Sequence, residues 1–142
     1  MTQDRTSRII NGVNENKKIL VVDDEASMIE ALSKTLTTEG FVVLTASNGE
    51  EGLALALKEH PDLILLDLLM PKLDGRGTLT NLREDEWGKN VPVIILTNVS
   101  PDADQTLQSI TEHQPAYYLV KPEITLLEIV EKVKDVLHLP QK

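Results

Sequence analysis

Short runs of apolar residues alternate along this chain with longer stretches in which apolar residues recur every three or four positions. The runs occupy residues 19–22, 41–46, 63–67, 92–97 and 117–120. Runs of this length, bounded by polar residues, Gly or Pro, are typical of strands that are buried on both faces. The stretches between them are typical of amphipathic helices. Strict alternation of the two predicts an α/β, doubly wound (βα)5 fold with a five-stranded parallel sheet.

Each predicted helix has a set of apolar residues on one face. These sets are Ile29, Leu32 and Leu36; Leu53, Ala56 and Leu57; Leu79 and Leu82; Leu107 and Ile110; and Leu126, Ile129, Val130, Val133 and Leu137. Ser27, or an acidic residue before it, is expected to cap the first helix, and Gly40 to end it. The fourth helix, near residues 103–112, has the fewest apolar anchors, which favours a movable element.

Polar side chains stand where four of the strands end. Asp23 and Asp24 follow the first strand, Asp67 ends the third, Thr97 ends the fourth and Lys121 follows the fifth. Taken singly, each has an ordinary explanation, such as a helix cap, a strand-end residue or a surface lysine. Because the carboxyl ends of parallel strands share one edge of the sheet, however, we expect these side chains to converge on a common site.

Three crowded carboxylates repel one another unless protons or a cation join them. Oxygen ligands of this kind suit Mg²⁺, which accepts one or two carboxylates together with waters and phosphate oxygens. Asp67 could then attack a phosphorus atom and form an acyl phosphate. The Thr97 hydroxyl and the Lys121 ammonium would contact the phosphoryl oxygens.

Composition narrows the remaining classes of function. The chain has 142 residues, which fits one domain at residues 17–142 after a polar, flexible tail at residues 1–16. A net charge of −9 disfavours direct binding to nucleic acid, and the lack of cysteine excludes thiol chemistry. No apolar run is long enough for a membrane span or a signal peptide, so we expect a cytoplasmic protein without membrane insertion.

Four motifs together resemble the receiver domain of two-component response regulators, the CheY-like family, over residues 17–139. The motifs are Val22-Asp23-Asp24-Glu25; Leu66-Asp67-Leu68-Leu69-Met70-Pro71 with Asp74-Gly75; Ile95-Leu96-Thr97; and Tyr118-Leu119-Val120-Lys121-Pro122. The resemblance implies the flavodoxin-like strand order 2-1-3-4-5.

The same resemblance implies roles for individual residues. Asp67 would be the phosphoacceptor for a sensor histidine kinase or a phosphotransfer protein. Mg²⁺ would be held by Asp24, by Asp67 and by the backbone carbonyl of Leu69, with Asp23 binding it through a water.

The resemblance further implies that Thr97 and Tyr118 form a switch pair and that Lys121 contacts the phosphoryl group. The Lys121-Pro122 peptide bond would be cis. Output would pass to a protein effector through the face built from the fourth helix, the fifth strand and the fifth helix.

The predicted function is therefore that of a phosphoacceptor response regulator, with no enzymatic activity beyond self-catalysed phosphorylation and slow dephosphorylation. One alternative is a receiver domain from a larger hybrid kinase or transcription factor. Another is a Mg²⁺-dependent phosphohydrolase with an aspartyl-phosphate intermediate, which would favour an acid/base carboxylate at the position of Leu69. A scaffold that works without phosphorylation is disfavoured by the complete acidic pair and Lys121.

Overall fold

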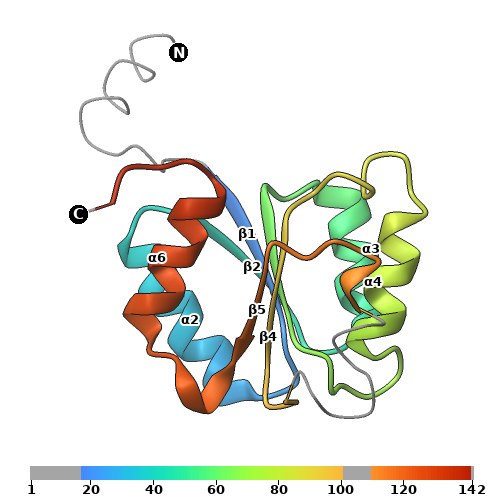
Figure 1. Cartoon of the computed structure of the whole chain (residues 1–142), viewed down its shortest axis with the longest axis horizontal. Coiled ribbons are helices and arrows are strands. Elements are labelled where there is room, and N and C mark those ends of the chain that lie inside the picture. Colours follow the sequence, from blue (N-terminus) through green and yellow to red (C-terminus); the bar gives the residue numbers. More distant parts are fainter. Residues whose placement is uncertain (1–16, 101–109, 142) are drawn as a thin grey trace, which may run out of the picture.

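The computed structural model describes residues 17–100 and 110–141 of the chain (Figure 1). Its strands are β1 (Lys18–Val22), β2 (Val42–Ala46), β3 (Leu63–Leu66), β4 (Val93–Thr97) and β5 (Tyr117–Val120). They form one parallel sheet in the order β2-β1-β3-β4-β5. The predicted fold class and strand order are confirmed, and no strand boundary differs from the prediction by more than one residue.

Helices cover both faces of this sheet (Figure 1). On one face lie α2 (Ala26–Thr38) and α6 (Leu126–Val136), and on the other lie α3 (Gly49–Glu59) and α4 (Gly75–Arg83). Alternate residues of each strand enter opposite apolar clusters: in β1, Ile19 packs with the α2 and α6 side, whereas Leu20 packs with the α3 and α4 side. Burial of both faces explains why β1, β3 and β4 read as continuous apolar runs, whereas the edge strand β2 leaves Val42 and Thr45 exposed.

Local capping chemistry explains where most of the helices begin. The side chains of Asn48, Asp74 and Thr125 each accept a backbone N–H from the first turn of α3, α4 and α6, respectively. The exception is α2: its cap residue is Glu25, the acidic alternative to Ser27 that the sequence offered, but the Glu25 side chain makes no such hydrogen bond. Gly40, with a positive φ of 100°, follows the end of α2 as predicted.

The inward face predicted for α3 is partly wrong, because Leu57 is 38% exposed. The residues buried along this helix are Gly49, Gly52 and Ala56. A Cβ atom on Gly52 would lie 2.7 Å from the Val22 side chain. Small residues therefore let α3 lie close to the sheet, and α3 packs through Gly49, Gly52 and Ala56 rather than through Leu57.

The predicted tail at residues 1–16 and most of the predicted fourth helix, including Leu107, lie outside the described residues. Ile110 is buried among the residues beneath α3 and α4, as expected. Within residues 17–100 and 110–141, no helix combines the length and the apolar character needed to cross a membrane.

Candidate functional site

The candidate site lies where the connections of the sheet diverge, between β1 and β3. Val22 and Leu66, the last residues of these two strands, are partners in the parallel register. Asp23 and Asp67 follow them directly, so the two carboxylates leave the sheet from neighbouring positions. Such a divergence, at the carboxyl ends of the strands, is where open α/β sheets bind ligands.

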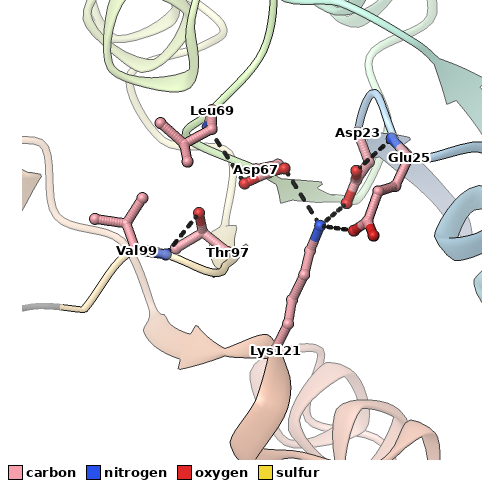
Figure 2. A network of polar contacts seen from close by, with 7 residues as sticks. All are labelled: Asp23, Glu25, Asp67, Leu69, Thr97, Val99 and Lys121. Carbon is pink, nitrogen blue, oxygen red and sulfur yellow. Dashed lines mark hydrogen bonds and ion pairs between the residues drawn. The ribbon is translucent and has the colours of Figure 1, made fainter.

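The structure brings together the acidic residues predicted from the sequence. One carboxylate oxygen each from Asp23, Asp24 and Asp67 lie within 4.8 Å of one another. Asp23 and Asp67 are 2% and 4% exposed, whereas Asp24 is open to solvent. Lys121, at the end of β5, points its ammonium group between the two buried carboxylates (Figure 2).

The contacts of this ammonium group define the charge balance of the site. Lys121 Nζ lies 2.8 Å from Asp23 Oδ2 and 3.3 Å from Asp67 Oδ2. It also lies 2.6 Å from Glu25 Oε1, a contact that the sequence reasoning missed. The only sequence signal for this contact is that Glu25 continues the acidic run of Asp23 and Asp24.

Burial and ion pairing act against each other at this site. Burial raises the pKa of Asp23 above its ordinary 3.8, outweighing the lowering effect of hydrogen bonds from Lys121 and from the Glu25 N–H. For Lys121, burial alone would lower the pKa. Its hydrogen bonds to Asp23 and Glu25, together with the charge of Asp67, outweigh burial and raise that pKa. The lysine is therefore a fixed positive charge at neutral pH.

The donor set fits a hard divalent cation. One ammonium faces several carboxylates, so negative charge remains, and three oxygens lie close enough to share an ion. Asp24, Asp67 and the backbone carbonyl of Leu69 would hold Mg²⁺, with Asp23 acting through a water. The Leu69 main chain lies beside Asp67, since its N–H donates to Asp67 Oδ1 at 3.3 Å. When bound, Mg²⁺ would neutralise the acidic site and offer coordination positions to phosphate oxygens.

Thr97 and Tyr118 are joined through the main chain of Val99. Thr97 is fully buried, and its Oγ1 accepts the Val99 N–H at 3.4 Å (Figure 2). The Tyr118 hydroxyl donates to the Val99 carbonyl at 2.8 Å. Among the hydrogen bonds of the described residues, none joins Thr97 directly to Asp67. Burial raises the pKa of the partly buried Tyr118, and the charge of Asp67 adds to this.

The cis Lys121-Pro122 bond implied by the family resemblance is wrong, because the described chain contains no cis peptide bond. Residues Lys121–Glu123 instead form a single 3-10 turn. Proline at the start of a helical turn loses no hydrogen bond, because the N–H at that position has no partner within the turn.

The sequence is similar to those of known signalling proteins. The model of the family described as the response regulator receiver domain matches residues 19–134. A probable transcriptional regulator, ycf27 of Porphyra purpurea, is 42% identical over 91% of this chain and 51% of its own length. Protein PilH of Pseudomonas aeruginosa is 38% identical over 82% of this chain and 96% of its own length. The chain thus spans about half the length of the first of these relatives and nearly all of the second.

Solved structures agree with the sequence comparison. The chemotaxis protein CheY4 of Vibrio cholerae has a TM-score of 0.77 and 30% identity, covering 85% of this chain and 98% of that chain. CheY of Borrelia burgdorferi, in a complex with CheX, BeF3 and Mg²⁺, has a TM-score of 0.75 and 28% identity over 84% of this chain and 88% of that chain.

Proposed function

Since this chain belongs to the response regulator receiver domain family of two-component signalling, we propose that Asp67 is its phosphoacceptor, loaded by a histidine kinase or a phosphotransfer protein. The observation that carries the proposal is the position of Asp67. It is a buried carboxylate at the divergence of the sheet, facing a lysine ammonium 3.3 Å away and two further aspartates.

Each side chain of this site has a separate role in phosphoryl transfer. An oxygen of Asp67 forms the new bond to phosphorus, while the bond from phosphorus to the donor atom breaks and its electron pair stays on the donor. Lys121 stabilises negative charge on the phosphoryl oxygens, and the Thr97 hydroxyl donates a hydrogen bond to one of them. Transfer thereby depends on positioning and charge rather than on an acid/base side chain.

The signal would travel from Thr97 to the edge of the sheet. A phosphoryl group adds about two negative charges and three acceptor oxygens. Moving Thr97 towards it disturbs the bond to Val99, whose carbonyl holds the Tyr118 hydroxyl. That movement would change the face that includes β5 and α6, where we place contact with a protein effector. We propose no direct contact with nucleic acid and no enzymatic activity beyond self-catalysed phosphorylation and slow dephosphorylation. A cytoplasmic location stays a prediction from the sequence.

The test of the phosphoacceptor is chemical labelling. Incubation with acetyl phosphate and Mg²⁺ should add one phosphoryl group to the protein, as measured by intact mass spectrometry, and Asp67→Asn should abolish it. The matched control is Asp74→Asn, because asparagine caps a helix as well as aspartate does and Asp74 caps α4. Labelling of the Asp67→Asn protein at another residue would contradict the assignment.

The metal site has a separate test. Asp24→Asn should weaken Mg²⁺ binding by about tenfold or more, since interactions with charged groups contribute about 1.5–3 kcal/mol each. Isothermal titration calorimetry measures this directly, with Asp74→Asn again as the control that removes a carboxylate elsewhere. An unchanged affinity in Asp24→Asn would show that Asp24 does not ligate the ion.

A further inference from the structure

The ammonium group of Lys121 lies closer to Glu25 than to the phosphoacceptor. Its three carboxylate distances are 2.6 Å to Glu25, 2.8 Å to Asp23 and 3.3 Å to Asp67 (Figure 2). Charge-assisted N–H···O bonds are usually about 2.7–2.9 Å long. The contact with Asp67 is therefore the weakest of the three, and the lysine is held towards the loop that follows β1.

The Glu25 side chain makes this contact instead of capping its own helix. Glu25 occupies the cap position of α2, where a side chain normally accepts a backbone N–H of the first turn, yet it makes no such bond. It reaches instead to a residue 96 positions away. Its own N–H donates to Asp23 Oδ1 at 2.9 Å, which fixes the base of the side chain beside the site.

Glu25 also differs from the other two carboxylates in exposure. Its side chain is 49% exposed, whereas those of Asp23 and Asp67 are 3% and 5% exposed. A half-exposed carboxylate can exchange its ion pair for water at little cost, but a buried one cannot. Glu25 is thus the partner that Lys121 can leave.

From these observations we propose that Glu25 is a positioning residue, which competes with Asp67 for the Lys121 ammonium group and keeps it nearer to Glu25 until a phosphoryl group draws the lysine across. This inference rests on the proposed function, since it assigns to Lys121 the role of contacting the phosphoryl oxygens. Its consequence is that the Glu25 ion pair opposes the movement of Lys121 towards the incoming group. Glu25 would slow loading of the phosphoryl group and hold the resting state in place.

The first test compares labelling rates under saturating Mg²⁺. Glu25→Gln removes the charge, and Glu25→Asp keeps the charge but shortens the reach. Both should speed labelling by acetyl phosphate roughly two- to fivefold, the ratio expected for loss of a half-exposed ion pair. Glu30→Gln removes the same charge from an exposed position in α2 and should leave the rate unchanged.

The second test uses the unphosphorylated protein, so it does not depend on whether Asp67 accepts a phosphoryl group. The side-chain ammonium resonance of Lys121, measured by ¹H–¹⁵N NMR, should shift in Glu25→Gln and Glu25→Asp but not in Glu30→Gln. An unshifted resonance would overturn the inference, as would unchanged or slower labelling in both Glu25 variants. Failure to label the parent protein, by contrast, would overturn the proposed function itself.

Discussion

Gly75→Ala is expected to lower the free energy of unfolding by about 3 kcal/mol, near the upper end for overpacking a filled interior. A Cβ atom on Gly75 would lie 2.2 Å from the carbonyl oxygen of Asp67 and 2.6 Å from the Cα of Leu68. Both are backbone atoms, so the clash cannot be relieved by turning a side chain. Relief would have to displace the main chain that carries the phosphoacceptor, so labelling of Asp67 should fall together with stability.

The matched control lies two residues further along the same helix. A Cβ atom on Gly77 would meet the Leu73 Cδ1 atom at 2.6 Å, which is the end of a flexible side chain. Replacing glycine inside a helix by alanine gains about 1 kcal/mol, so Gly77→Ala should be neutral or stabilising. Chemical denaturation measures both variants, and equal losses of stability in the two would refute the steric argument.

Lys121→Met is expected to cost about 3–5 kcal/mol in the absence of Mg²⁺ at neutral pH, the usual penalty for removing one partner of a buried ion pair. The change leaves Asp23 and Asp67 facing each other with almost no access to water. Their mutual repulsion would then lack the ammonium group of Lys121, which now lies within ion-pair distance of both carboxylates.

Lowering the pH should restore part of the free energy of unfolding that the Lys121→Met variant loses. The pKa of Asp23 is already raised by burial, and losing the lysine removes an influence that lowers it. The folded variant would therefore bind a proton more tightly than the unfolded chain. Its stability should rise, relative to the parent protein, as the pH falls through this raised pKa towards the ordinary value of 3.8.

Lys134→Met provides the control for loss of a buried lysine. The Lys134 side chain is 7% exposed and pairs with Glu39 at 2.8 Å, and neither residue belongs to the acidic site. Mg²⁺ should stabilise Lys121→Met more than it stabilises the parent protein. It should stabilise Lys134→Met by the same amount as the parent protein. Thermal unfolding with and without Mg²⁺ decides this, and the same Mg²⁺ response in all three proteins would count against the account.

The parts of this structure that could be predicted follow from simple periodicities. The central strands β1, β3 and β4 are buried on both faces and leave unbroken apolar runs, so their ends can be read to within a residue. Parallel strands share one edge, which is why Asp23, Asp67 and Lys121 could be expected together despite their separation in sequence. The strand order came from family resemblance rather than from any pattern of hydrophobicity.

The parts that could not be predicted depend on distances in three dimensions. The exposure of Leu57 could not be read from helical periodicity, because α3 packs against the sheet through the small residues Gly49, Gly52 and Ala56. The ion-pair partner of Glu25 is 96 residues away in the sequence. Because Glu25 lies where a helix cap is expected, the sequence gives no reason to look for a distant partner. The link through Val99 uses its main-chain N–H and carbonyl groups, so the residue type at this position does not predict it.

That last link has a consequence for how such a protein can change over evolutionary time. Thr97 and Tyr118 both bind the backbone of Val99, so any residue that keeps its N–H can preserve the connection. The identity of the side chain at this position therefore does not decide the connection, although Val99 itself packs against the apolar cluster beneath α3 and α4, and Thr97 and Tyr118 stay coupled through its main chain. Mutation could retune the rim of the site, and with it the choice of partner or the timing of the response, without breaking the relay beneath.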